Sequence, residues 1–427
     1  MVKSNADNAK DGFYNRNPLG KNQHGDCPSL DDEKVATILR DYNRRNIVSK
    51  KTIKALLLAE HNIKMSEATI TRRRQALGLH ASGATTKTMS DTIKRQLILD
   101  QMAKDPTSHQ GPRIIKENIA LDTGIHLTRD WITMEMRLID PSGFESRSPT
   151  AKRIHRVAVV ALGPHYRWSG DGHDKLVKIG WPIWGVRDVW SGKWLGLWVV
   201  PDNRLKVATA YLFLKLVEEL GGMPIQMVTD CGSETTKIYG VATALREIFN
   251  PDLPVSEFPA HRFMRSVNNI TIERGWLRLR LQWGDNVLVF WEAGRDIYNP
   301  TDPQQYELVQ WLWSTIIQKE LDTLKARFND HKVRFDADKL IPSGVSPNVA
   351  YSLMEKYGGE DCLQPVDITI IKQLKEELGG DDIIRFVGAE YEAKAVSVFH
   401  DLGLTDDDLS LQRAWHVFSL MLPLMPL

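Results

Sequence analysis

The first third of the chain places apolar residues at helical spacing, broken by polar residues that cap helices. Apolar positions recur at intervals of three and four in the first such stretch, namely Val35, Ile38, Leu39 and Tyr42. This spacing is typical of a helix with one buried face. Ser49 and Ser66 are suitable N-caps for two further helices, and Gly78 would end the last one. We therefore predict three short helices over residues 30–80, arranged as a helix-turn-helix module.

The same pattern returns further along the chain. Residues 63–71 align with residues 125–133, an offset of 62, with identical Ile, Ile and Thr residues and conservative Met/Leu and Ser/Thr exchanges. In both copies a capping hydroxyl, Ser66 or Thr128, directly follows an apolar residue. The repeat predicts a second helix-turn-helix module over residues 88–140.

Two segments lack this periodicity. Residues 1–29 are rich in Asn, Asp, Gly and Lys, which is typical of a disordered lead-in. Residues 141–162 contain Pro-Ser-Gly and Ser-Pro turn signals, so we expect a linker there.

From residue 163 the pattern changes to short apolar runs that alternate with amphipathic stretches. Aromatic and β-branched residues predict strands, and a Ser191-Gly192 turn joins two of them. The expected strands are Tyr166–Asp171, Trp181–Asp188, Trp194–Val200 and residues 223–230. The expected helices between and after them are Leu205–Leu220, Thr235–Phe249 and Asn269–Trp283. We predict an α/β core with a mixed sheet over residues 163–350.

The predicted helix Asn269–Trp283 has an apolar stripe and, beside it, two charged residues on one side. Ile272, Trp276, Leu279 and Trp283 fall on one stripe, which predicts a buried face. Glu273 lies about 100° around from that stripe, and Arg280 shares its side of the helix. The remainder, residues 351–427, is acidic and helical in pattern, and we expect a small C-terminal domain without chemistry of its own.

Charge is distributed unevenly along the chain. Residues 1–160 contain 27 Lys and Arg against 18 Asp and Glu, whereas the net charge of the whole chain is +1. A basic front region favours nucleic-acid binding. Arg72, Arg73 and Arg74 lie on the helix that would enter a DNA groove, and they are the DNA-binding candidates. The alternative is a plain helical bundle with solvated arginines.

Cysteine content and hydropathy further restrict the class of protein. The three cysteines, Cys27, Cys231 and Cys362, are far apart, which excludes a disulfide framework and a four-cysteine zinc site. No signal peptide or apolar run of membrane-spanning length is present, so we expect a soluble intracellular protein.

Three acidic residues stand out as candidate metal ligands. Asp171 and Asp230 are placed at the ends of two predicted strands, and Glu273 lies on the helix described above. Such a set could bind two Mg²⁺ or Mn²⁺ ions that activate a nucleophile and stabilise the leaving oxygen of a phosphodiester. The plausible phosphate contacts are Arg262, Arg265 and Arg280.

Each acid also has a structural interpretation. Asp171 in Gly-Asp-Gly could be a turn residue, Asp230 could cap a helix, and Glu273 could belong to a solvated helix face. Asp188 and Asn269 are secondary candidates, and Asp188 suits a structural role before the Ser191-Gly192 turn. His173 suits packing or solvent exposure better than metal binding.

Three blocks of the sequence resemble the catalytic blocks of the integrase core, in the superfamily of retroviral integrases and DDE transposases. The blocks are Trp168-Ser-Gly-Asp171-Gly-His-Asp-Lys-Leu, Thr229-Asp230-Cys-Gly-Ser-Glu and Asn269-Ile-Thr-Ile-Glu273-Arg-Gly-Trp. The chain is similar, more closely, to transposon-derived integrase-core proteins of fungal genomes, which share Gly163-Pro-His and Arg187-Asp-x-Trp-Ser-Gly-Lys-Trp. The resemblance covers about residues 163–350.

The resemblance implies a ribonuclease-H-like fold and metal-dependent cleavage and strand transfer on DNA, with Asp171, Asp230 and Glu273 as the catalytic acids. It also implies DNA as partner, an oligomer of at least two copies, and the nucleus as location in a eukaryote. A domesticated, catalytically inactive DNA-binding protein is the alternative. Three departures are visible: a 43-residue interval between Asp230 and Glu273, no zinc module before the core, and Gly170 at a strand position.

Overall fold

The computed structural model describes residues 28–29, 32–146, 160–264 and 269–425. It divides into two compact units, residues 1–81 and residues 82–427. The expected lead-in up to residue 27 and much of the expected linker, residues 147–159, lie outside the described residues. Within the part that is described, no helix is long and apolar enough to cross a membrane.

The first unit contains the three helices that the sequence predicts over residues 30–80. They are α2 (Glu33–Arg44), α3 (Lys50–His61) and α4 (Glu67–Ala76). The side chains of Asp32, Ser49 and Ser66 each accept a hydrogen bond from a backbone N–H in the first turn of their helix. The caps predicted at Ser49 and Ser66 are therefore confirmed, and the use of these helices as a helix-turn-helix module stays a prediction.

The second unit begins with another group of short helices. They are α5 (Ser82–Thr88), α6 (Asp91–Ala103), α7 (Pro112–Thr123), α8 (Arg129–Ile139) and α9 (Pro141–Ser146). Thr128 precedes α8 but makes no capping hydrogen bond, unlike Ser66 in the first copy. Residues 141–146 form the short helix α9 where we expected a linker, because Pro at a first helical position and Ser-Gly after it are compatible with a helical turn.

These helices are tied to the core by polar contacts. The backbone N–H of Thr107 donates to Asn286 Oδ1 at 3.0 Å, and the Gln110 side chain donates to the carbonyl oxygen of Gln282 at 2.8 Å. Arg327 also donates to Asp122 at 2.8 Å. This group of helices therefore belongs to the same compact unit as the core.

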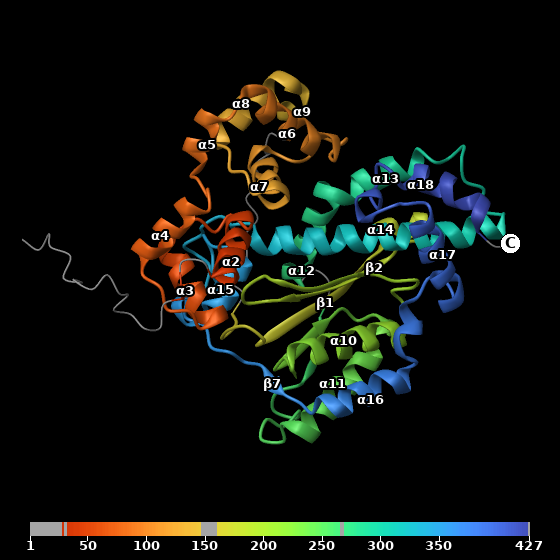
Figure 1. The fold of residues 1–427 in the computed structure, drawn as a ribbon. Coiled ribbons are helices and arrows are strands. Elements are labelled where there is room, and N and C mark those ends of the chain that lie inside the picture. Colours follow the sequence, from red (N-terminus) through yellow and green to blue (C-terminus); the bar gives the residue numbers. More distant parts are fainter. Residues whose placement is uncertain (1–27, 30–31, 147–159, 265–268, 426–427) are drawn as a thin grey trace, which may run out of the picture. The chain divides into compact units, whose positions relative to one another are not determined.

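A five-stranded mixed sheet forms the centre of the second unit (Figure 1). Its strands, in spatial order, are β3 (Trp194–Val199), β2 (Ile183–Asp188), β1 (Arg167–His173), β5 (Gln226–Thr229) and β6 (His261–Phe263). The first three pair antiparallel, whereas β1, β5 and β6 pair parallel. The sheet and its flanking helices are consistent with the expected ribonuclease-H-like core. The three-residue strand β6 was not predicted, because it is too short to show a periodicity.

Helices cover both faces of this sheet (Figure 1). One face buries Trp168, Trp184 and Met227 against α10 (Lys206–Leu220), α11 (Thr236–Phe249) and α16 (Ile368–Leu378). The other face buries residues of β2 and β3 against α12 (Ile270–Leu279) and the 28-residue helix α14 (Pro303–Asp330). The sheet is thus the middle of three layers.

The helix predicted over Asn269–Trp283 is interrupted. It consists of α12, a π-helical segment at Arg280–Gly284 and α13 (Asp285–Glu292). The predicted stripe is nevertheless buried, since Ile272, Trp276, Leu279 and Trp283 are each at most 4% exposed. π-Helical turns inside helices are frequent at functional sites.

The long helix α14 protects the edge of the sheet. The side-chain amide of Gln318 accepts from Val199 N and donates to Leu197 O, both at 3.1 Å. Asn329, three turns further on, pairs in the same way with the backbone of Trp194. These two amides satisfy groups of edge strand β3 that a neighbouring strand would otherwise bind.

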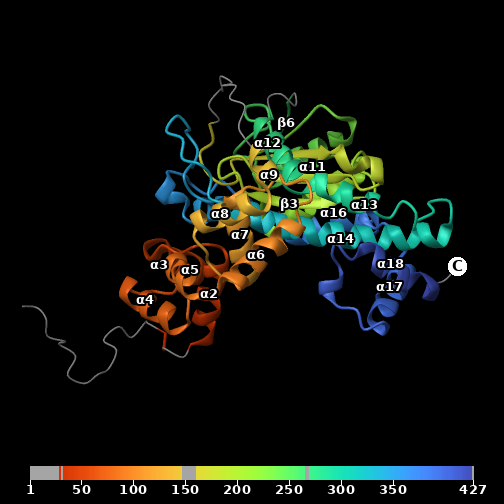
Figure 2. The ribbon, with the colours of Figure 1, turned by 90° about the horizontal axis from the view of Figure 1, so that it is seen from above.

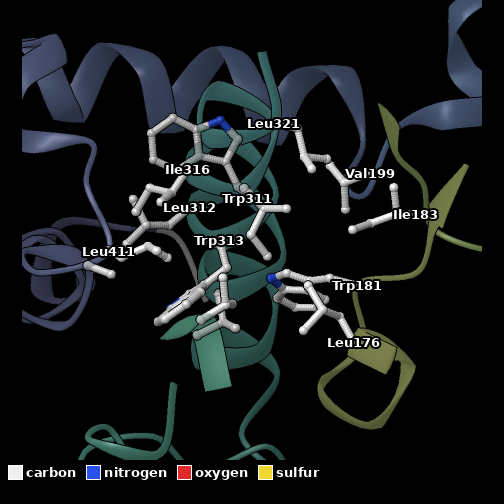
Figure 3. Close-up of a cluster of buried hydrophobic side chains, with 14 of the residues drawn as sticks. Leu176, Trp181, Ile183, Val199, Trp311, Leu312, Trp313, Ile316, Leu321 and Leu411 are labelled. Atoms are coloured by element: carbon white, nitrogen blue, oxygen red, sulfur yellow. The ribbon is translucent and has the colours of Figure 1, made fainter. Parts of the chain in front are cut away.

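The C-terminal helices share the cores of the central region. α16 contributes Ile371 to the core below the sheet, and α17 (Ala389–Asp401) and α18 (Ala414–Met421) pack against α14. In Figure 3, Leu312 and Trp313 of α14 lie between Leu411 of the C-terminal region and Trp181 before β2. Other short elements of this unit include β4 (Gly222–Met223), α15 (Pro347–Ser352) and β7 (Gln364–Pro365).

Candidate functional site

Strand β1 presents a different chemistry on each face. Ser169, Asp171 and His173 alternate with Trp168 and Gly170, as successive residues of a strand must. The odd-numbered side chains point toward α12, because Ser169 donates to Asn269 Oδ1 at the start of that helix. β1 therefore places polar groups under α12 and apolar groups on the opposite side of the sheet.

The sequence led us to expect Asp171 at the end of its strand, and this expectation is wrong. β1 continues to His173, because β2 pairs with it throughout, with Asp171 opposite Gly185. On its other side the ladder with β5 ends at Ser169 and Val228. Asp171 therefore stands on a face of the sheet, at the point where pairing with β5 has stopped.

Asp230 lies on the neighbouring strand at the same level. The parallel register pairs Ser169 with Val228, so two residues further along both chains it sets Asp171 beside Asp230. Neighbouring strands lie about 4.8 Å apart, and residues with the same register point to the same face. Asp230 is half-buried, and its Oδ1 accepts a weak hydrogen bond from Gly232 N at 3.4 Å.

Helix α12 brings the third acid to this place. Glu273 lies in the first turn of α12 and is exposed. The start of the helix is fixed to the sheet by the Ser169–Asn269 hydrogen bond and by Arg187 of β2, whose guanidinium donates to the carbonyl oxygen of Thr271. The first turn, and with it Glu273, is thereby held over the end of β1.

Trp276 connects α12 directly to Asp171. Its indole N–H donates to Asp171 Oδ2 at 2.9 Å, and its ring stacks on His173 with centroids 4.9 Å apart. This close approach requires Gly185, since a Cβ there would lie 2.6 Å from Cη2 of Trp276 and 2.8 Å from Trp194. Gly275 serves the same packing, because a Cβ at that position would lie 2.4 Å from the Trp194 ring. We identified the buried stripe from the sequence but not this hydrogen bond.

The electrostatics show that the three acids act on one another. The pKa of Asp171 is raised from 3.8 to about 7, mainly by burial; the hydrogen bond from Trp276 opposes this shift, and the negative charges of Asp230 and Glu273 contribute to it. Burial and the charge of Asp230 also raise the pKa of Glu273. Each effect is the one expected for carboxylates gathered without a compensating cation.

The donor chemistry of this acidic cluster, defined as Asp171, Asp230 and Glu273, suits a hard divalent cation. The positions of the side chains, in contrast, do not match a metal site. In the described part of the chain, no three His, Cys, Asp or Glu side chains form a group that could hold a metal ion. The exposed Glu273 side chain is the member least fixed by its surroundings. The cluster therefore fits a metal by charge and ligand type, and does not form a closed ligand set in this structure.

The neighbouring candidates differ in their surroundings. His173 is buried, burial lowers its pKa to about 4, and its Nε2 has no hydrogen-bond partner among the residues that the structure describes. Asn269 is 5% exposed, and its amide nitrogen likewise lacks a partner within the described chain. Asp188 is fully buried and accepts from Ser191 N, from the Ser191 hydroxyl and from His165 N. Asp188 is thus a structural residue of the β2–β3 turn.

The predicted phosphate contacts are placed unequally. Arg262 is exposed on β6, Arg280 is half-buried at the start of the π-helical segment, and Arg265 lies outside the described residues. In the first unit, Arg72 is exposed. Arg73 is 4% exposed and donates to the backbone of Pro28 and Ser29.

Arg74 also has an intramolecular partner, since its guanidinium donates to Val48 O at 2.7 Å. Burial of Arg73 removes its charge from the surface, and this was not foreseeable from the Arg-Arg-Arg run alone. Among the three arginines of α4, Arg72 is the one whose side chain is exposed.

Comparison with known families agrees with this geometry. A model of the integrase core domain family matches residues 157–346, which include the whole sheet and all three acids. No curated protein matches the chain. The family match supports a place in the integrase and DDE-transposase superfamily, a nucleic-acid-processing function of the integrase or transposase type, and DNA as the partner.

Proposed function

We propose that this chain is a DNA integrase or transposase that cleaves phosphodiester bonds and joins DNA strands with Mg²⁺ or Mn²⁺. The observation that carries the proposal is the acidic cluster, in which two strands and one helix gather Asp171, Asp230 and Glu273. Burial raises the pKa values of Asp171 and Glu273, and the charge of the neighbouring Asp230 raises both further. Divalent cations would relieve this repulsion. The match of residues 157–346 to the integrase core supports the same function.

The proposed reaction has two chemically similar steps. In cleavage, the oxygen of a water attacks phosphorus, and the bond from phosphorus to the 3′ oxygen breaks, which leaves a free 3′-hydroxyl. In strand transfer, that 3′-hydroxyl attacks a phosphodiester of the target and displaces its 3′ oxygen. Two bound ions would stabilise the attacking and leaving oxygens. The residues that would hold them are Asp171, Asp230 and Glu273.

DNA binding is proposed for three exposed or half-exposed arginines. Arg72 of the first unit is placed to contact a DNA groove or backbone, and Arg262 and Arg280 would contact phosphates near the acidic cluster. Replacing Arg72 by Ala should weaken binding of a random DNA duplex and lower the slope of log affinity against log salt by about one. Arg73→Ala is the matched control, and it should lower the free energy of unfolding of the first unit because Arg73 holds the Pro28–Ser29 backbone.

The test of the enzyme is a strand-transfer reaction. The full chain is incubated with blunt-ended DNA duplexes and a supercoiled plasmid in Mn²⁺, Mg²⁺ or EDTA. We expect nicked circles that carry one covalently joined oligonucleotide, and we expect none in EDTA. Binding of DNA without nicking or joining under any metal condition would contradict the proposal.

A second function is a DNA-binding protein that derives from a transposase and has lost catalysis. The specific observation in its favour is that no group of three potential metal ligands is closed within the described residues. Glu273→Gln separates the two functions, because it removes a charge while keeping the size of the side chain. An unchanged cellular effect of this variant would favour the inactive protein, and its loss would favour the enzyme.

By analogy with transposases that hold two DNA ends, we further propose an assembly of at least two copies. A transposon-derived origin in a fungal genome and a nuclear location belong to the same proposal. Size-exclusion chromatography with light scattering, with and without DNA, would measure the number of copies.

A further inference from the structure

Helix α8 presents apolar side chains to the surface. Met134 is 51% exposed, Leu138 is 70% exposed and Trp131 is half-buried. These three residues, spaced three and four apart, form one row along the helix, which we call the α8 stripe. The buried residues of α8, which include Ile132 and Met136, lie on another side of it. α8 packs beside α7 and α9 (Figure 2), and the α8 stripe is a second apolar side that stays exposed next to these neighbours.

The two aligned helices of the repeat, α4 and α8, bury equivalent positions. At the offset of 62 residues, Ile70 corresponds to Ile132, and both are 0% exposed. Arg73 corresponds to Glu135, and both are 4% exposed. The carboxylate of Glu135 accepts two hydrogen bonds from Arg95 of α6, at 2.8 and 3.2 Å. An exposed position on one helix can therefore be compared directly with its counterpart on the other.

The exposed positions of the two helices differ in their chemistry. On α4 the counterparts of the α8 stripe are Thr69, Arg72 and Ala76. The exposed Arg72, a DNA-binding candidate, thus corresponds to Met134 at the centre of the α8 stripe. Aromatic residues and Met are enriched in protein interfaces, whereas DNA phosphates are contacted by cations and hydrogen-bond donors. The α8 stripe is therefore suited to a protein partner and not to the DNA backbone.

Charged residues beside the α8 stripe indicate the kind of partner. Asp130 and Arg137 are both exposed, and they are seven residues apart, which is about two turns. They therefore lie on the same side of the stripe, with the acid near the start of the helix and the cation near its end. A two-fold axis near Met134 would set two copies of α8 antiparallel. In that pairing Asp130 meets Arg137 of the other copy, and Trp131 meets Leu138 of the other copy.

The tryptophan at one end of the α8 stripe is fixed by its neighbours in the same chain. Lys94 of α6 is buried, and its ammonium group lies 4.5 Å from the centroid of the Trp131 ring. The same ammonium group donates to Thr86 O at 2.8 Å and forms an ion pair with Asp91 at 2.6 Å. An aromatic side chain that is already ordered loses little conformational freedom on association, so Trp131 is suited to anchor a contact.

We propose that the α8 stripe is the contact surface between two copies of this chain, related by a two-fold axis near Met134. The proposal rests on the proposed function for its expectation of at least two copies, and it adds which surface joins them. Three apolar side chains from each copy would form the centre of the contact, and the pairs of Asp130 with Arg137 would form its rim. The assembly would contain two acidic clusters, one for each DNA end.

The experiment is sedimentation velocity on the full chain in EDTA and without DNA, over a series of protein concentrations. The first variant is Leu138→Glu. Leu58→Glu is its matched control, because Leu58 is 47% exposed on α3 of the first unit. The second set reverses the charges, with Arg137→Asp alone, Asp130→Arg alone, and both together. Thermal unfolding checks that every variant is folded.

We expect the wild type and Leu58→Glu to dimerise with the same dissociation constant. Leu138→Glu should raise that constant about a hundredfold, because association would bury an unpaired carboxylate. Each single charge reversal should raise it about tenfold, because like charges would then face each other across the contact. The double reversal should restore dimerisation, since it exchanges the acid and the cation without changing their pairing.

Three results would overturn the proposal. They are a wild-type chain that stays monomeric, a Leu138→Glu variant that dimerises as the wild type does, and a double reversal that dimerises no better than the single ones. Weaker binding of a random duplex by Leu138→Glu, at concentrations where the wild type is monomeric and with unchanged self-association, would assign the stripe to DNA instead.

The outcome is distinguishable from that of the proposed function. Dimerisation through the α8 stripe without strand transfer in Mn²⁺ would support the contact surface and contradict the enzyme. Strand transfer by a chain that does not self-associate would contradict the contact surface alone.

Discussion

The two faces of strand β1 differ in their surroundings, because successive residues of the strand point to opposite sides of the sheet. On the α10 face, Trp168 is fully buried in an apolar core, and a Cβ on Gly170 would lie 2.4 Å from the Met227 methyl group. On the α12 face, Asp171 and His173 are polar groups removed from water. The first face lowers the free energy of the fold by burial, whereas the second holds titratable groups where burial disfavours their charged forms.

This difference indicates that stability and function depend on opposite faces of the same strand. A desolvated carboxylate near two others has no structural advantage, and its persistence is typical of sites that later bind a cation or substrate. The α10 face compensates for that cost within the same strand. Changes on one face should therefore affect stability, and changes on the other should affect chemistry.

The largest expected effect concerns the chemistry alone. Asp171→Asn should reduce metal-dependent strand transfer to background, because the amide no longer provides the negative charge that a divalent cation requires. Asp174→Asn is the matched control, since that aspartate is 52% exposed at its side chain and is paired with Arg204. Equal activity of both variants in the strand-transfer assay would contradict the assignment of the chemistry to the α12 face of β1.

The next effect concerns stability alone. Trp168→Ala should lower the free energy of unfolding of the second unit by about 3–5 kcal/mol, the usual cost of removing a buried aromatic ring. It also removes the hydrogen bond from the Trp168 indole to His165. Chemical denaturation followed by circular dichroism measures the change, and a loss below about 1 kcal/mol would show that this face is not the stabilising one.

The pH dependence of stability should show that ionised Asp171 on the α12 face destabilises the fold. The pKa of Asp171 is raised to about 7 in the folded state, so between pH 4 and pH 7 the folded chain holds a proton that the unfolded chain has released. In EDTA, stability should fall by about 1–3 kcal/mol as pH rises through this window. Asp171→Asn should flatten the profile, and a wild-type profile that rises in this window would contradict the raised pKa.

The smallest effect should come from Trp276→Phe. Phenylalanine keeps most of the ring that packs on His173 and Trp194 but lacks the N–H that donates to Asp171. Loss of one hydrogen bond to a charged group should weaken apparent Mn²⁺ activation about tenfold. Titration of strand transfer with Mn²⁺ measures this, and the melting temperature should change little. A large fall in melting temperature with unchanged Mn²⁺ dependence would make Trp276 a packing residue only.

Much of the fold follows from local patterns in the sequence. The helix caps at Ser49 and Ser66, the buried stripe of α12 and the strands around Ser191-Gly192 were all predictable, because each depends on residues that are neighbours in the chain. The three acids were selected by their positions at two predicted strand ends and on one helix, and by their resemblance to known catalytic blocks. Their roles as metal ligands stay a prediction.

Tertiary structure decided the features that depend on residues far apart in sequence. The extension of β1 past Asp171 required pairing with β2, and the hydrogen bond from Trp276 to Asp171 required a glycine at position 185. Burial of Arg73 required the backbone of Pro28 and Ser29. Periodicity reports which face of an element is apolar, but only the packed chain determines which charge is desolvated and what it contacts, because those energies depend on distances that no local pattern contains.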